Sequence, residues 1–308
     1  GDVYKRQALR HAGKVWTLDG GEGIRLQGLY SQQPGDSRGL AVLLHGWEGS
    51  VNSNYVLANG ARLFAEGFDV FRLNFRDHGD THHLNQEIFH SCRLDEVVWS
   101  LRDLQNRLGA GSWCLAGYSL GGNFSMRVAL KAESAGLDIA HVVAVNPVIN
   151  PLHAMVSMEE GIRFYERYFE RKWSRSLKTK TQAFPDLYGH ETWHDIRGLR
   201  NRTHYLATTH AGYESAEQYF EGYSIAGDRL APALDRRPDR ARDGGPADTP
   251  PPIHPALTPA PRHRMTRCPP CSPDSAAPCG STAREAARRR SRECAAAPNR
   301  SSASRARS

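Results

Sequence analysis

The strongest constraint on the fold is an alternation of short apolar runs and segments of helical periodicity between residues 39 and 146. The run LAVLL at residues 40–44 is apolar throughout, which is typical of a strand buried on both faces of a sheet. Strands are expected at 39–45, 68–75, 113–116 and 139–146, a hairpin at 15–18 and 24–30, and helices at 55–66, 94–108 and 123–132. Strands that alternate with helices of this length predict an α/β fold with a mostly parallel sheet and helices on both faces.

One turn in this pattern carries a chemical motif. Residues 113–124 read WCLAGYSLGGNF, so Ser119 lies between Gly117 and Gly121 at the joint of a strand and a helix, as in the G-x-S-x-G nucleophile elbow. A nucleophile on so tight a turn has strained backbone angles, and its neighbours two residues away must lack bulk. The competing interpretation is a loop serine that is flanked by glycines for no catalytic reason.

Charge divides the chain of 308 residues into two parts. The formal charge is +7, but residues from 231 onward hold 15 Arg, no Lys and 7 acidic residues, a net of +8. Residues 1–230 therefore carry a net charge of −1, which gives no electrostatic reason to expect a nucleic-acid partner.

The C-terminal segment, residues 231–308, has the composition of a disordered chain. It contains 14 of the 18 prolines and no Phe, Tyr or Trp, so it cannot bury enough surface to offset its ordering entropy. Cys268 and Cys271 have C-x-x-C spacing, but no second pair follows at zinc-site distance, which favours incidental cysteines over a metal site.

The N-terminal end and the hydropathy bear on location. Residues 1–7 (GDVYKRQ) precede any pattern and resemble a non-native leader, so they are set apart from the fold. No apolar stretch approaches the roughly 20 residues of a membrane span, and no signal-peptide pattern opens the chain. A cytoplasmic protein is therefore expected.

Residues 150–225 interrupt the alternation. A stripe of large side chains at helical spacing predicts a helical cap that covers the site; its members are Met158, Ile162, Tyr165, Tyr168, Phe169 and Trp173. The alternative is that the stripe packs a helix onto the sheet, and both interpretations can hold together. The main domain is expected to span residues 8–230.

With these motifs in place, the chain resembles the α/β-hydrolase superfamily, and within it bacterial esterases related to the acylglycerol-lipase and short-chain carboxylesterase branch. The resemblance covers about residues 13–230. It is carried by HGWEGS at 45–50, by GYSLGG at 117–122, and by NFRDHG at 74–79, which departs from the NFRGxG-like turn of the family at Asp77 and His78.

The resemblance implies a role for each matching residue. Ser119 is the acyl nucleophile, and the backbone N–H groups of Trp47 and Leu120 form the oxyanion hole. His45 and Gly46 belong to the loop that supplies the first of these donors, and Gly117 and Gly121 flank the nucleophile. No cofactor and no metal are implied.

The triad acid and histidine are missing from the expected place. The fold implies two further strands from about residue 232, followed by loops with the acid and the base, but APALDRRPDRARDGGPADTPPPIHP stands there. A frameshift would explain this segment, whereas a genuine basic tail for RNA or acidic partners is the rival. Asp248 and His254 fall there by count, and His204 and His210 in the cap are weaker candidates for the base.

These observations predict a serine hydrolase of small uncharged carboxylic esters, weakly active or inactive in this chain, with an unpaired sheet edge where strands are lost. The alternatives are a non-catalytic ligand-binding protein of the same fold, and a thioesterase or peptidase. The sequence leaves the oligomeric state open. The loop RDHGDTHHLNQEIFH holds His78, His82, His83 and His90, which could bind a metal but more plainly line a pocket, with His90 as a hydrogen-bonded structural residue.

Overall fold

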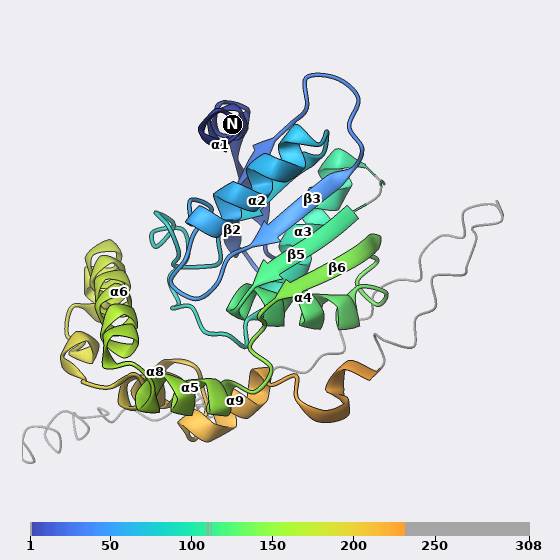
Figure 1. Ribbon diagram of the computed structural model, residues 1–308. Helices are drawn as coiled ribbons and strands as arrows, with labels where there is room; N and C mark the ends of the chain where they lie inside the picture. Colours follow the sequence, from blue (N-terminus) through green and yellow to red (C-terminus); the bar gives the residue numbers. More distant parts are fainter. Residues whose placement is uncertain (1, 110, 112, 232–308) are drawn as a thin grey trace, which may run out of the picture. The chain divides into compact units, whose positions relative to one another are not determined.

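The computed structural model describes residues 2–109, 111 and 113–231 (Figure 1). Six strands form one sheet: β1 Gly13–Asp19, β2 Arg25–Ser31, β3 Leu40–Leu44, β4 Asp69–Leu73, β5 Trp113–Tyr118 and β6 Ile139–Val145. The helices are α1 Asp2–His11, α2 Asn54–Ala65, α3 Leu94–Leu108, α4 Leu120–Lys131, α5 Pro151–Glu160, α6 Arg163–Ala183, α7 Pro185–Tyr188, α8 Leu199–His210 and α9 Ala216–Tyr223, with 3-10 turns η1 Trp193–Asp195 and η2 Gly227–Leu230.

The sheet has the strand order β1-β2-β4-β3-β5-β6. The first two strands form the expected antiparallel hairpin, β2 pairs antiparallel with β4, and the remaining pairs are parallel. The predicted α/β fold with a mostly parallel sheet is therefore confirmed. This strand order brings the carboxyl ends of the parallel strands β3, β4, β5 and β6 to one edge of the sheet.

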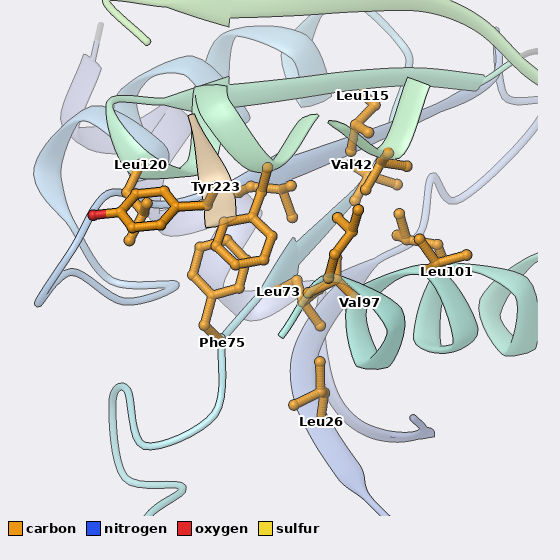
Figure 2. Packing of buried hydrophobic residues seen from close by; sticks show 14 of the residues in the cluster. Leu26, Val42, Leu73, Phe75, Val97, Leu101, Leu115, Leu120 and Tyr223 are labelled. Carbon is orange, nitrogen blue, oxygen red and sulfur yellow. The ribbon is translucent and has the colours of Figure 1, made fainter. Parts of the chain in front are cut away.

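Strand β3 shows how the two faces are covered. Leu43 belongs to a buried cluster with Val56 and Leu57 of α2, whereas Val42 points to the opposite face and packs in the cluster that contains α3 and α4. Figure 2 shows part of this second cluster, with Leu101 of α3 close to the strand side chains. Alternating side chains of one apolar strand thus hold helices on both sides of the sheet.

Helix α1 has no counterpart among the expected elements, because residues 1–7 are set apart in the sequence as a non-native leader. Residues 2–7 are helical, and the helix continues to His11. Leu9 is fully buried and packs in the cluster that joins α2 to the sheet. The origin of the first residues stays a prediction, but the helix they begin is part of the packed fold.

Residues 150–225 form mostly helices, as expected, and Figure 1 shows them beyond the end of the sheet where β5 and β6 stop. The aromatic stripe does not lie on one helix, because α5 ends at Glu160 and α6 begins at Arg163. Met158 therefore lies on a different helix from Tyr165 and Trp173. No helix of the described part of the chain is long and apolar enough to cross a membrane.

The expectations for residues 232–308, including the disordered tail, the frameshift, the cysteine pair, Asp248 and His254, lie outside the described residues. Within the described sheet, β6 is the last strand and pairs on one side only. Its Val143 and Val145 side chains are 47% and 41% exposed.

Candidate active site

Ser119 lies on a sharp turn between the end of β5 and the first residue of α4. Its φ and ψ are 53° and −116°, values that a residue with a Cβ adopts only when its surroundings impose them. Its N–H donates to the Val145 oxygen at 2.9 Å, its own carbonyl oxygen accepts from Asn123, and its side chain is exposed. The turn therefore holds the hydroxyl at the edge of the sheet, open to solvent.

The two glycines of the motif are required by close backbone contacts. A Cβ on Gly117 would lie 2.0 Å from the Gly121 oxygen. A Cβ on Gly121 would lie 2.4 Å from the main-chain oxygens of both Leu44 and His45. The second contact shows that the turn after β5 packs directly against the end of β3.

The loop after β3 reaches the serine. A Cβ on Gly46 would lie 3.3 Å from the Ser119 Cβ, and the Gly46 N–H donates to the Tyr55 hydroxyl at 2.9 Å. The next N–H along this loop, that of Trp47, has no acceptor within the described residues, and neither has the N–H of Leu120 at the start of α4. Two unpaired main-chain donors thus come from the two segments that meet at Ser119.

His45 fixes this loop from beneath. Its imidazole is fully buried, its Nδ1 lies 2.7 Å from the Gly46 oxygen, and its Nε2 accepts from the Phe75 N–H at 3.2 Å. Because Nε2 is an acceptor, the ring proton is on Nδ1, which donates to Gly46. Burial lowers the pKa of His45 to about 4, so the ring is neutral and serves as a structural link.

Helix α6 contacts the same loop from the cap. The Trp47 ring stacks on the Phe169 ring with centroids 5.2 Å apart. The Trp47 ring also meets the Trp173 ring edge to face, with centroids 5.0 Å apart. Lys172, between them in sequence, donates from Nζ to the Glu48 main-chain oxygen at 2.7 Å. The sequence pattern predicted the aromatic side chains of this helix but did not identify Lys172.

Backbone strain gathers at the carboxyl ends of the parallel strands. Non-glycine residues with positive φ follow β3, β4, β5 and β6, and they are Glu48, Asp77, Ser119 and Asn146. All four line one cavity of about 1260 Å³. Such residues cluster at functional sites, because unfavourable backbone conformations persist only where the surrounding structure enforces them.

The cavity extends between the sheet edge and the cap. Its walls are largely apolar and aromatic, with Met155, Met158, Phe169, Trp173, Phe220 and Tyr223 among the lining residues. Ser119, Trp47 and Leu120 line it as well. The sequence-predicted site residues therefore lie together, with a large apolar space in front of the serine.

The loop after β4 places three histidines on this cavity. His78 is buried, its Nδ1 lies 2.7 Å from the Arg76 oxygen, and its Nε2 has no partner in the described part of the chain. His82 hydrogen bonds through Nε2 with the Ser176 hydroxyl at 2.8 Å. His90 was expected to be hydrogen bonded, but its buried Nδ1 has no partner among the described residues, because the ring lies against Tyr213 and Tyr219 instead.

Asp77, one of the two departures from the family turn, has a clear structural partner. Its carboxylate accepts from Lys180 Nζ of α6 at 2.9 Å and from the Phe89 N–H at 2.8 Å. Lys180 is 1% exposed and also donates to the carbonyl oxygens of Asn85 and Glu87. Burial raises the pKa of Asp77 and lowers that of Lys180, while their mutual attraction opposes both shifts.

The cap histidines considered as a catalytic base do not line the cavity. His204 is exposed, and His210 lies 3.0 Å from a Glu191 carboxylate oxygen among the aromatic side chains of Tyr188 and Trp193. No hydrogen bond joins the Ser119 hydroxyl to a histidine within the described residues. The same residues include no group of three or more His, Cys, Asp or Glu arranged to hold a metal ion.

The strand order, the strained serine turn after β5 and the adjoining loop after β3 together define an α/β-hydrolase fold. The sequence profile of the family described as "alpha/beta hydrolase fold" matches residues 41–183, so the chain is similar to that family over this range.

Two relatives among known proteins carry esterase names. The chain is 27% identical over 182 residues to the "Putative esterase YheT" of Escherichia coli, covering 58% of this chain and 53% of that protein. It is 27% identical over 187 residues to "Protein phosphatase methylesterase 1" of Aspergillus oryzae, covering 57% of this chain and 40% of that protein. The chain thus spans about half the length of the curated relatives it matches.

The solved structures similar to this chain include the esterase Pf2001 of Pyrococcus furiosus. The TM-score is 0.42 at 16% identity, over 62% of this chain and 66% of that chain.

Proposed function

We propose that the protein is a serine esterase that cleaves small, uncharged carboxylic esters through an acyl-enzyme on Ser119. The observation that carries the proposal is the exposed Ser119 hydroxyl on a strained turn, beside unpaired N–H groups from two different segments. The esterase names of the two relatives support the same reaction class.

In this mechanism water takes the Ser119 hydroxyl proton as the serine oxygen attacks the ester carbonyl carbon, and the carbonyl oxygen becomes an oxyanion. The N–H groups of Trp47 and Leu120 donate to that oxyanion. As the tetrahedral intermediate collapses, the bond to the alkoxide oxygen breaks and the alcohol leaves with a proton from water. Water then attacks the acyl-enzyme and releases the acid. Removal of one oxyanion donor typically lowers kcat by about 10²–10³, so the loop that presents Trp47 contributes to the rate even though its side chains do not react.

The cavity supports an ester with an apolar acyl group. Apolar groups form the larger part of its walls, with aromatic and methionine side chains among them. Lys172, Arg175 and Glu48 also line the cavity, but residues 1–230 carry a net charge of only −1. A short to medium acyl chain would replace water along the apolar walls.

The test uses p-nitrophenyl butyrate and a fluorophosphonate probe on the full chain. Ser119→Ala should abolish both hydrolysis and covalent labelling, and peptide mapping should locate the label on Ser119. Ser157→Ala is the matched control, because Ser157 also lines the cavity but hydrogen bonds only with its own helix. Labelling that survives Ser119→Ala would exclude this residue as the nucleophile.

We further propose that this chain hydrolyses esters slowly, because no histidine of the described residues hydrogen bonds with the Ser119 hydroxyl. Enzymes that lack their triad residues still accelerate the reaction by about 10³–10⁴ over the rate in water, through the oxyanion hole and substrate binding alone. Added imidazole should therefore accelerate hydrolysis by the unmodified chain, measured against Ser119→Ala in the same buffer. Fast hydrolysis that imidazole leaves unchanged would show that a base is already present.

A second candidate function is a non-catalytic protein that retains a ligand in the same cavity. Within residues 2–231 as the structure describes them, no histidine hydrogen bonds with the Ser119 hydroxyl, and this favours the alternative because an unactivated serine is a weak nucleophile. Tight binding of an apolar carboxylic acid without probe labelling, even with imidazole present, would favour this alternative.

A further inference from the structure

Helix α6 has an outer face that no described element covers. Residues three or four apart lie on one side of a helix, and such spacing joins Phe164, Arg167, Tyr168, Arg171, Arg175 and Lys178, which we call the outer stripe. All six side chains are exposed, including Phe164 at 75% and Tyr168 at 45%. The opposite face carries Phe169, Trp173 and Leu177, which pack against the remainder of the fold.

The outer stripe has one sign of charge. It contains four cations, whereas the acidic residues of the helix, Glu166 and Glu170, are partly buried. The Glu170 carboxylate is turned toward the start of α8, where it accepts from the Gly198 N–H at 2.7 Å. The cations are therefore not neutralised by the acidic residues of their own helix.

Apolar side chains extend this face at the start of α6. Ile162 is 78% exposed and Tyr165 is 54% exposed, next to Phe164. Exposed aliphatic and aromatic groups side by side are costly in water and mark an interaction surface. Polynucleotides offer stacking partners for aromatic rings but no comparable environment for an aliphatic side chain such as Ile162.

We propose that the outer stripe of α6 docks on an anionic phospholipid surface. Four or more Lys or Arg on an amphipathic helix suit anionic headgroups, and aromatic and aliphatic residues at one end suit the boundary between headgroups and acyl chains. The helix would lie on the surface with Ile162 and Phe164 inserted and Arg171 and Arg175 at the phosphates.

The position of the stripe links it to the cavity. Tyr165, Tyr168 and Arg175 line the cavity as well as the exposed face. An apolar ester could therefore pass from a lipid surface to the space before Ser119 without crossing bulk water. This link rests on the proposed esterase function, whereas lipid binding itself does not.

Cosedimentation of the full chain with vesicles tests the proposal. Binding should be strong with phosphatidylcholine mixed with phosphatidylglycerol and weak with phosphatidylcholine alone. The double variant Arg171→Glu with Arg175→Glu should have a vesicle–water partition coefficient about 30-fold or more below that of the unmodified chain. Each basic residue near an anionic surface raises this coefficient about fivefold. Phe164→Ser with Ile162→Ser should also weaken binding.

A matched control distinguishes the effect of charge reversal in the outer stripe from the effect of charge reversal elsewhere in the chain. Lys14→Glu with Arg62→Glu makes the same change in net charge at exposed residues of β1 and α2 and should leave vesicle binding near that of the unmodified chain. The arginines after residue 231 are present in every variant. Equal binding by the stripe variant and this control would overturn the proposal.

The variant Phe164→Trp gives a second readout. If this side chain inserts, the fluorescence emission of the new indole should shift to shorter wavelength with anionic vesicles and should be quenched by brominated lipids. An unchanged spectrum, preferential binding of single-stranded RNA over vesicles, or burial of the stripe in a dimer seen by sedimentation would each overturn the assignment. Hydrolysis of soluble p-nitrophenyl butyrate is measured separately, so failure of lipid binding is distinguishable from failure of the esterase proposal.

Discussion

The Lys172 ammonium group of α6 donates a hydrogen bond to the main-chain oxygen of Glu48, 2.7 Å away in the loop after β3. Glu48 has a φ of 54°, and the ring of its neighbour Trp47 stacks on Phe169 of the same helix. The cap therefore does more than cover the cavity: one of its helices holds the loop that presents the Trp47 N–H. A donor that is fixed before the substrate arrives stabilises developing charge without reorganisation.

Lys172→Met should lower kcat for p-nitrophenyl butyrate more than it changes KM. The variant removes a hydrogen bond from a charged donor, an interaction of about 1.5–3 kcal/mol, and this should free the loop to move. We expect a loss of about tenfold or more in kcat in steady-state assays. Lys178→Met is the control on the exposed face of the same helix. A rise in KM at constant kcat would assign Lys172 to substrate binding instead.

Gly121→Ala should disrupt the serine turn. The added Cβ would meet two main-chain oxygens at 2.4 Å, and neither Leu44 nor His45 can move without displacing β3. Probe labelling of Ser119 should fall to background, with a lower Tm in thermal unfolding. Gly35→Ala is the control, because a Cβ at that position meets nothing within 4 Å. Labelling at the level of the unmodified chain would show that the turn tolerates bulk.

Local chemistry explains which parts of the site the sequence predicted. The position of Ser119 follows from steric limits within five residues, so its turn could be found by inspection. The first helical residue after it was expected too late, because α4 begins directly at Leu120 without any preceding capping residue other than the serine.

Contacts between distant segments could not be predicted in the same way. Lys172 and Glu48 are 124 residues apart, and Lys180 and Asp77 are 103 apart. The sequence of α6 is rich in charged residues, and nothing in it indicates which lysine will be buried against the carboxylate of Asp77. The break between α5 and α6 was also missed, since Gly161 interrupts a side-chain pattern that otherwise continues in phase.

His45 should make stability depend on pH on the acidic side of neutrality. Its pKa is lowered from 6.5 to about 4 in the folded protein, so the unfolded chain takes up a proton first as the pH falls. The stabilisation is present above pH 6.5 and is lost between pH 6.5 and 4, at up to about 1.4 kcal/mol per pH unit. Urea unfolding at several pH values across this range should show that the free energy of unfolding depends less steeply on pH in His45→Asn than in the unmodified chain. The same dependence in both proteins would contradict the assignment.

The buried ion pair of Arg76 and Glu96 should be needed as a pair. Both side chains are buried, at 1% and 6% exposure, with 2.6 Å between Arg76 Nη2 and Glu96 Oε2. Glu96→Leu leaves the buried guanidinium with only the exposed Glu87 carboxylate, 3.7 Å from Arg76 Nη1, and should lower the free energy of unfolding by about 3–5 kcal/mol. The double variant with Arg76→Met should recover much of this loss in urea unfolding. Additive losses would show that the pair contributes through packing alone.

Val143 should promote self-association of the chain. Strand β6 (IAHVVAV) has a partner on one side only within the described sheet, carries no Lys, Arg, Asp or Glu, and exposes 47% of Val143. Such an edge is a template for pairing with another chain.

The opposite edge strand, β1, also exposes a valine, Val15 at 62%, but it includes Lys14 and Asp19, which discourage pairing. Val143→Lys should therefore reduce light scattering at high protein concentration, whereas Val15→Lys should change it little. Equal reductions by the two variants would mean that exposed apolar area, and not the uncharged edge of β6, controls association.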